Sequence, residues 1–195
     1  MRHILILSII SMLLGACRKE IKDCKDEEIT GRDKAVDISA IWSQQILDTL
    51  AKYPQLQPFN VFTTMYYNGV MCNVYYKDLL IFTDTYTLNK QFGGNDTLTS
   101  SGRLLRSDPG ISLEPTVTIT EAYKEAKKHV NFDNTCIKYR LGLFNSNYGN
   151  YSLAAKYELV WKIMDSQNPY IYVIINAVNK QVLMYRGDTQ WPGID

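Results

Sequence analysis

Few residues in this sequence have the types and the spacing that catalysis requires. Beyond residue 16 the only histidine is His129, and a His-based catalytic triad or a His-rich zinc site needs partners that one histidine cannot supply. Its place near the end of an expected helix suits a cation beside the helix dipole. Four aspartates fall in or beside expected turns, where Asp commonly bonds its own backbone: Asp84, Asp96, Asp108 and Asp133. We therefore expect no enzyme activity, no cofactor and no metal site.

One cysteine belongs to a more specific pattern. Residues 4–14 form an unbroken run of apolar and small residues after a positively charged start, which is the layout of a secretory signal. The run is too short to span a bilayer, because a spanning helix takes about 20 apolar residues. The letters "LGAC", ending at Cys17, resemble the lipobox of bacterial lipoproteins, in which this Cys is acylated. We predict a signal peptide over 1–16 and a lipidated Cys17; the alternative is an ordinary signal peptide.

The residues after Cys17 predict a tether and a location. Residues 17–34 mix both charge signs with few apolar residues, so we expect a flexible tether that cannot bury enough surface to fold. Two acyl chains suffice to hold a protein on a membrane. Arg18 stands where an inner-membrane retention signal resembles Asp, which favours the outer membrane of a cell envelope. Without residues 1–16 the acidic and basic residues are equal in number, which argues against a nucleic-acid partner.

The three remaining cysteines leave their pairing open. Cys24 lies in the expected tether, whereas Cys72 and Cys136 lie in or beside apolar strand patterns. An envelope compartment permits disulfides, and a Cys72–Cys136 bridge is one alternative. The sequence cannot supply the Cα separation that such a bridge requires. We favour buried free thiols.

The first half of the chain predicts a helix followed by strands. Apolar residues recur at helical spacing in "VDISAIWSQQILDTLAKYP", at Ile38, Ile41, Trp42, Leu47 and Leu50. Three apolar runs follow, and Asn68-Gly69 between the first two predicts a hairpin turn because both residues accept positive φ. We assign this unit to residues 35–88 and a connector rich in turn-forming residues to 89–111, with one short strand at 102–106.

The second half repeats this order. Thr118 and Glu121 have the spacing of a capping box before an amphipathic helix, "ITEAYKEAKKHV". The runs "TCIKYRLGLF" and "KYELVWKI" then alternate apolar and polar residues, as antiparallel strands with one covered face do. The last run, "YIYVIINAVNKQVL", predicts a hairpin. The fold class that follows is α+β, with two tandem units that each pack a helix on an antiparallel meander. The second unit spans 112–187, before a tail at 188–195.

The second unit resembles a PepSY domain. The similarity lies in "ITEAYKEAKKHV", in "YELVWKI" and in "YIYVIINAVNKQVL". The first unit, with "MYYNGVMCNVYY", resembles the fungalysin and thermolysin propeptide motif that often precedes PepSY. Where the family hairpin has Thr-Gly, this chain has Asn179-Lys180, and we expect Asn179 to take the left-handed position because Lys is poorly suited to it.

The resemblance implies a binding role. Related tandem modules precede a metallopeptidase and block its cleft, so we expect a non-enzymatic, membrane-tethered lipoprotein that binds or restrains a secreted peptidase. Candidate contacts are Tyr148 and Tyr151 in a turn-rich loop, and Trp191 and Pro192 in the tail, because Tyr and Trp are enriched at interfaces. Alternatively, Trp191 folds back onto the sheet. A general envelope module that binds a peptide or a glycan in a concave aromatic groove is the second hypothesis, and an enzyme is the third.

Overall fold

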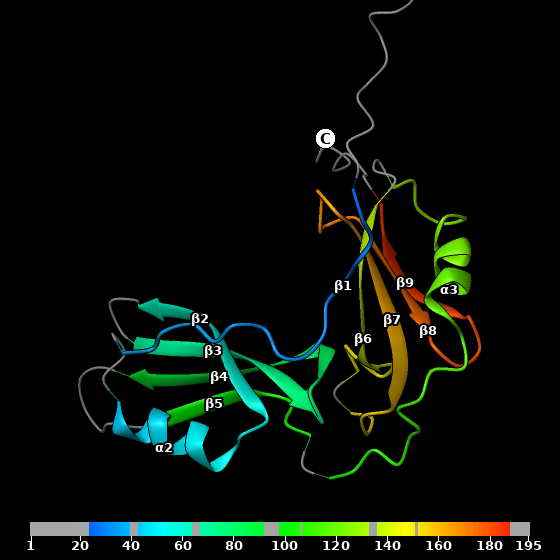
Figure 1. The fold of residues 1–195 in the computed structure, drawn as a ribbon. Helices are drawn as coiled ribbons and strands as arrows, with labels where there is room; N and C mark the ends of the chain where they lie inside the picture. The colour runs from blue at the N-terminus through cyan, green and yellow to red at the C-terminus, as the bar shows by residue number, and fades with distance from the viewer. Residues whose placement is uncertain are drawn as a thin grey trace, which may run out of the picture.

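Runs of alternating and β-branched residues form most of the secondary structure (Figure 1). The structure is a computed structural model, and it describes residues 24–39, 43–63, 67–91, 98–105, 107–132, 136–150 and 152–187. The described elements are, in chain order, β1 (Glu27–Glu28), α2 (Gln44–Lys52), β2 (Leu56–Thr63), β3 (Tyr67–Tyr76), β4 (Leu79–Gln91), β5 (Leu98–Gly102), α3 (Ile119–Ala126), β6 (Ile137–Asn145), β7 (Tyr157–Asp165), β8 (Tyr172–Asn176) and β9 (Val182–Arg186).

All nine described strands belong to one mixed sheet, so the prediction of two separate helix-on-meander units is wrong. The sheet runs β2-β3-β4-β6-β7-β8-β9, with β5 paired to β4 and β1 to β6. Strand accounts for 44% of the chain and helix for only 12%, which makes the protein mostly β. We call α2 with β2–β5 the first limb and α3 with β6–β9 the second limb. Figure 1 shows the limbs set at an angle, with one helix on each.

The limbs meet at a short parallel pairing, which we call the joint. Leu80 of β4 lies opposite Gly142 of β6, and Ile81 lies opposite Leu143. A side chain at Gly142 would lie 2.6 Å from the Leu80 carbonyl oxygen and 2.6 Å from the ring of Phe82. Glycine is therefore the residue that lets β4 approach β6 closely. Sequence periodicity carried no signal of this pairing, because it joins residues about 60 positions apart.

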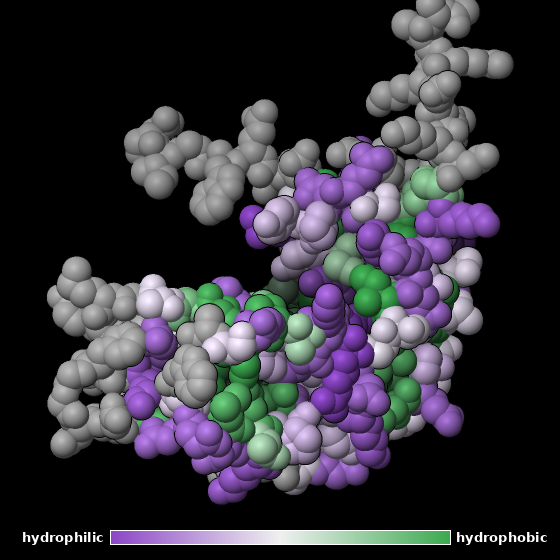
Figure 2. Space-filling model, turned by 60° about the vertical axis from the view of Figure 1, so that its left-hand side comes forward, coloured by the Kyte–Doolittle hydropathy of each residue, from purple (hydrophilic) through white to green (hydrophobic). Residues whose placement is uncertain are grey.

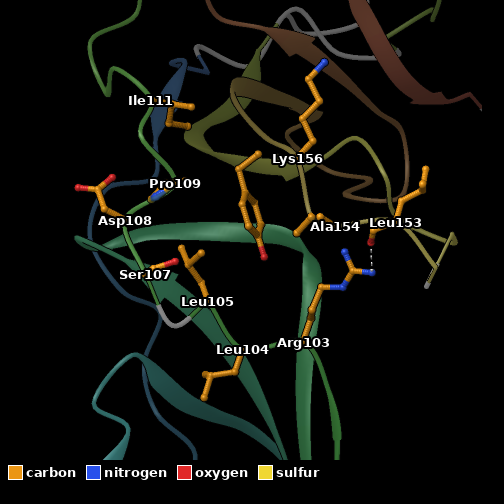
Figure 3. Close-up of a pocket in the computed structure, with 12 residues that line it drawn as sticks. Arg103, Leu104, Leu105, Ser107, Asp108, Pro109, Ile111, Leu153, Ala154 and Lys156 are labelled. Carbon is orange, nitrogen blue, oxygen red and sulfur yellow. Dashed lines mark hydrogen bonds between the residues drawn. The ribbon is translucent and has the colours of Figure 1, made fainter.

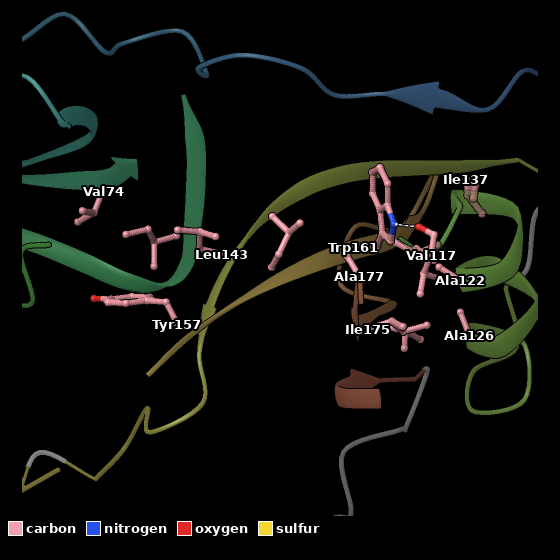
Figure 4. Close-up of a cluster of buried hydrophobic side chains, with 14 of the residues drawn as sticks. Val74, Val117, Ala122, Ala126, Ile137, Leu143, Tyr157, Trp161, Ile175 and Ala177 are labelled. Carbon is pink, nitrogen blue, oxygen red and sulfur yellow. Dashed lines mark hydrogen bonds between the residues drawn. The ribbon is translucent and has the colours of Figure 1, made fainter. Parts of the chain in front are cut away.

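A single hydrophobic core runs through both limbs. Val74 of the first limb, Leu143 and Tyr157 at the joint, and Trp161 beneath α3 belong to one buried cluster (Figure 4). Trp161 Nε1 donates a hydrogen bond of 2.8 Å to the Val117 carbonyl. Because the same cluster crosses the joint, the limbs share a core.

The two helices begin in different ways. Thr118 and Glu121 form the predicted capping box at the start of α3, which confirms that prediction. At the start of α2 the Ser43 side chain makes no capping bond. Leu47, which we placed on the buried stripe of that helix, is 44% exposed. The helix pattern therefore predicted α3 better than α2.

Both turn predictions are corrected. Asn68-Gly69 lies inside β3, where Gly69 faces Phe62 across the strand pair and leaves room for its ring. The two-residue turn lies instead between β3 and β4, at Lys77 and Asp78, whose φ values are 46° and 65°.

In the last hairpin Lys180, not Asn179, takes the left-handed conformation, with φ 66°. Asn179 instead accepts a hydrogen bond from the Gln181 N–H at 2.9 Å through its side chain. The Lys180 ammonium lies 2.6 Å from Glu121. This ion pair links the hairpin to the first turn of α3, and it gives Lys180 a role in the turn.

The segment 24–34, predicted as part of the tether, lies against the sheet. Cys24 forms a disulfide with Cys136, with their Cα atoms 5.8 Å apart, so both the favoured free thiol at Cys136 and the alternative Cys72–Cys136 bridge are wrong. β1 pairs in parallel with β6, and Asp33 bonds to Arg140 at 2.8 Å. Charged residues can hold a segment that has no apolar face, which the composition argument overlooked.

Two further sequence predictions can be placed. Cys72 is a buried free thiol, and burial raises its pKa to about 12. The expected connector contains β5, which lies at Leu98–Gly102 instead of at 102–106. No helix among the described residues has the length and apolarity needed to cross a membrane.

Candidate functional site

A pocket of about 350 Å³ opens at the joint of the two limbs. In the space-filling view the surface is hollowed between the limbs (Figure 2). The pocket, which we call the lysine pocket, is lined by side chains of five strands and of the β6–β7 loop: Phe82, Thr83, Thr85, Phe144, Tyr148, Lys162, Tyr172, Ile174 and Met184.

The alternation of β7 and β8 explains how this pocket forms. Trp161 and Ile175 lie opposite each other and belong to the core beneath α3. Successive side chains of a strand point to opposite faces, so their neighbours Lys162 and Ile174 point away from α3. The face opposite α3 thus combines apolar side chains with one lysine.

Lys162 is the charged group of the lysine pocket. Its Nζ lies 4.8 Å from the ring centre of Tyr172 and 5.4 Å from that of Phe82, where an ammonium ion is attracted to the ring faces. No carboxylate among the described residues forms an ion pair with it, and Asp33 is bound to Arg140 instead. Burial, followed by the charge of Arg140, lowers the pKa of Lys162. The ammonium group can therefore gain an anionic partner.

A smaller polar pocket of about 110 Å³ adjoins the lysine pocket. The two pockets share Thr83, Thr85 and Tyr148. The remaining wall of the polar pocket comes from Asp84, Gly102, Arg103, Asn145 and Gly149.

Asp84 is held rigidly in the wall of the polar pocket. It is 3% exposed, and its Oδ2 accepts a hydrogen bond of 2.6 Å from the Tyr157 hydroxyl. Its Oδ1 accepts a bond of 3.2 Å from the Thr83 hydroxyl, whose oxygen accepts from the Asn145 N–H at 3.0 Å. Burial, followed by the hydrogen bond to Asp84, raises the pKa of Tyr157. The phenol therefore stays protonated and continues to donate at neutral pH.

Two buried donors in the same wall have no partner among the residues that the structure describes. They are Nη1 of Arg103 and Nδ2 of Asn145. Asn145 is 1% exposed, and Nη2 of Arg103 reaches the Leu153 carbonyl at 3.5 Å (Figure 3). A buried donor without a partner costs about 1–3 kcal/mol, so native proteins rarely leave one unless water or a ligand satisfies it. The polar pocket is thus prepared for an acceptor from outside the chain.

A larger hollow among the described residues also borders Arg103. It has a volume of about 810 Å³ and lies between the segment 103–111 and the loop before β7, as Figure 3 shows. Of the two buried donors without a partner, only Arg103 lines this hollow, whereas both line the polar pocket. We therefore place the candidate site in the two joint pockets, although they are smaller.

The structure places one of the predicted contact residues at this site. Tyr148 lies in both joint pockets and is 57% exposed. Cys17, Tyr151, Trp191 and Pro192 lie outside the described residues, so their assigned roles stay predictions.

Four residues of the site were missed from the sequence. Asp84 was placed in or beside a turn, and Lys162 among the polar residues of the alternating run "KYELVWKI". Arg103 was placed in the short strand expected at 102–106, and Asn145 in the turn-rich loop that follows "TCIKYRLGLF". Asp84 and Asn145 stand at positions where the chain buries its side chains. A polar residue within an otherwise apolar strand run was the only signal that could have marked them, because buried polar groups need specific partners.

In the part of the chain that the structure describes, no group of three or more His, Cys, Asp or Glu side chains could hold a metal ion. A comparison with models of protein families finds no match for the chain, and a comparison with curated proteins finds none either.

Proposed function

We propose that the protein is a non-enzymatic, membrane-tethered binding module of the cell envelope, which holds its ligand in the two pockets at the joint. One observation carries the proposal. The pockets meet at Tyr148, and the polar pocket contains two buried donors, on Arg103 and Asn145, that no described residue satisfies. A concave pocket with a few convergent polar groups and aromatic walls is the usual form of a ligand site.

The lysine pocket adds a charge requirement. The Lys162 ammonium is partly buried, contacts two aromatic rings and has no ion pair with a described carboxylate, so an ion pair with a ligand carboxylate would restore interactions that burial removed. The apolar wall around it excludes water and strengthens such a pair. We therefore expect the ligand to carry a carboxylate.

A peptidase partner has less support from the geometry than a general envelope ligand. That expectation depended on two tandem propeptide-like units, whereas the limbs share one sheet and one core. Two of the contacts chosen for it, Trp191 and Pro192, lie outside the described residues. Restraint of a peptidase stays a prediction, and the pockets favour the alternative of a peptide or glycan ligand.

Tethering follows from Cys17 and is tested separately. Mass spectrometry of the mature protein should find acyl chains on Cys17 as its first residue, and Cys17→Ser should leave an unprocessed precursor or a protein released from membranes. A mature wild-type protein without acyl mass would contradict the tether.

Binding is tested with an array of acidic and neutral peptides and glycans, probed with the lipid-free protein. Lys162→Met keeps an apolar stem between the rings but removes the charge, so carboxylate-bearing ligands should lose about tenfold or more in affinity. Lys138→Met is the matched control, because Lys138 lies on neighbouring β6 and is paired with Glu27 at 3.0 Å. Equal binding by Lys162→Met and wild type, or no binding to any member of the array, would contradict the proposal.

A further inference from the structure

The polar pocket also indicates the chemical class of the ligand. We propose, on the basis of the binding function above, that the ligand is an acidic oligosaccharide whose neighbouring hydroxyl groups enter the polar pocket beside Tyr148. The inference depends on which hydrogen-bonding groups the pocket leaves unsatisfied, on their charges and on the distance to Lys162.

The orientation of the Asn145 amide is determined by its neighbours. Its Oδ1 accepts hydrogen bonds of 3.1 Å from the backbone N–H groups of both Asn147 and Lys156. A flipped amide would place its NH₂ group against these two donors, so the flip is excluded. Nδ2 is therefore a true donor without a partner in the pocket wall.

Acceptors face the same small space. A carboxylate offers about four lone-pair sites, and the two hydrogen bonds to Asp84 from Tyr157 and Thr83 use two of them. The pocket wall thus contains unsatisfied donors on Arg103 and Asn145 and spare acceptor capacity on Asp84. A group that both accepts and donates fits such a wall, and a hydroxyl group does both.

Charge selects against an anion in the polar pocket. Asp84 and Arg103 are the only acid and the only base that line it, among the described residues, so their formal charges cancel. A neutral ligand group keeps this balance, whereas a carboxylate would add a negative charge beside a buried one. Two neighbouring hydroxyl groups of a sugar ring therefore fit better than an acidic side chain.

Tyr148 supplies the contact that a sugar ring needs besides hydrogen bonds. Its side chain is 57% exposed and lies in the wall of both pockets. The face of an aromatic ring packs against apolar C–H groups, while its hydroxyl stays wet. Every pyranose ring has such a C–H face, whereas a short acidic peptide need not contain an apolar surface that packs on Tyr148.

The separation of Lys162 from Asn145 along the sheet favours more than one sugar. Lys162 lies opposite Arg140, which is five residues along β6 from Asn145, so their backbones are about 17 Å apart at about 3.3 Å per residue. An oligosaccharide with a uronic acid can place hydroxyl groups near Asn145 and a carboxylate near Lys162.

The test is calorimetric titration of the lipid-free protein with trigalacturonate, its methyl ester and triglutamate. Trigalacturonate should bind with Kd below about 1 mM, and the methyl ester and triglutamate should bind at least about tenfold more weakly. Arg103→Met and Tyr148→Ala should each weaken trigalacturonate about tenfold. Tyr170→Ala is the matched control, because Tyr170 is 70% exposed and lines neither pocket.

Melting temperatures of the variants show whether a loss of affinity is caused by a loss of stability. Arg103→Met also removes the bond from Nη2 to the Leu153 carbonyl and the positive charge beside Asp84, so its melting temperature should fall. Tyr148→Ala changes an exposed side chain and should keep the wild-type melting temperature, so its loss of affinity reports on binding alone. Wild-type affinity in a folded Tyr148→Ala protein would overturn the inference.

Three further outcomes distinguish the two proposals. Tight binding of triglutamate without trigalacturonate would overturn the saccharide class and keep the binding function. Trigalacturonate binding that is unchanged in Arg103→Met and Tyr148→Ala would overturn the site, with water alone filling the polar pocket. No binding of any of the three probes, together with an unreactive array, would overturn both proposals.

Discussion

The two limbs have the same order of elements but are held together differently. In the second limb, α3 begins with a capping box, and the buried Trp161 bonds to the backbone just before it. In the first limb, α2 begins at Ser43, which makes no capping bond and whose buried hydroxyl has no partner. Local sequence therefore determines the second limb more strongly, whereas the first limb depends on its attachment to the second.

The attachment between the limbs is short, and buried polar side chains lie beside it. Only two residue pairs join β4 to β6, and the Tyr157–Asp84 bond follows directly beyond them. The comparison suggests that a rigid second limb holds one wall of the ligand site and the first limb holds the other. Four changes test this division, in order of expected effect.

The largest effect should come from the disulfide that fixes the N-terminal segment to the second limb. Replacing Cys24 and Cys136 with Ser removes a cross-link over 112 residues, and we expect a loss of about 3 kcal/mol in the free energy of unfolding. Urea denaturation under oxidising conditions measures it. Cys72→Ala, in the first limb, is the control and should cost less than about half as much. A smaller loss for the cross-link than for Cys72→Ala would contradict the assigned order.

Gly142→Ala perturbs the joint itself. The added carbon would lie 2.6 Å from the Leu80 carbonyl oxygen, and because backbone cannot give way cheaply we expect a loss of about 2 kcal/mol. Gly187→Ala is the control, since nothing lies within 4 Å of a side chain there. Equal stability of the two variants would show that the limbs do not depend on this close approach.

The helix starts compare the limbs directly. Thr118→Ala removes the capping bond to Glu121 and should cost about 1 kcal/mol. Ser43→Ala removes a buried hydroxyl that has no partner, so the free energy of unfolding should stay within about 0.5 kcal/mol or rise. Urea denaturation of both variants measures the difference. An equal loss in both would mean that the helices are fixed in the same way.

The smallest effect concerns the Lys180–Glu121 pair. Lys180, followed by the Thr118 cap, lowers the pKa of Glu121 from 4.5 to about 2. Since the folded pKa lies below the unfolded one, this contribution to stability is full above pH 4.5 and is lost as pH falls toward 2. In Lys180→Met the pKa of Glu121 should rise, and a carboxyl NMR titration should detect the shift. An unchanged titration curve would remove Lys180 as the main cause.

Sequence reasoning predicted the parts of the fold that depend on neighbours in the chain. The capping box at Thr118 and Glu121 is a local pattern, and the alternation in the sequence predicted β6 and β7 as antiparallel strands. The expectation that only one face is covered was wrong, because Arg140 and Val160 on the other face are buried too. The joint could not be predicted, because the Leu80–Gly142 pair is selected by close approach in space. Gly142, inside β6, was the only feature of the sequence that could have indicated the joint.

The site was less predictable than the fold. Tyr148 was chosen for its exposed loop and does line both pockets. Asp84 and Asn145 become a site only because β4 of the first limb pairs with β6 of the second limb. Arg103 looks like an ordinary connector residue until its buried Nη1 is seen without a partner.

The most direct measurement is an NMR titration of ¹⁵N-labelled, lipid-free protein with trigalacturonate. Asn145 Nδ2 and Arg103 Nη1 are buried donors without a partner among the described residues, so the signals of these two side chains report the proposed contact directly. We expect these signals and the amides of Thr83 and Thr85 to shift together with one Kd, while the signals of α2 stay in place. Saturation that leaves the Asn145 and Arg103 side-chain signals unmoved would contradict the account.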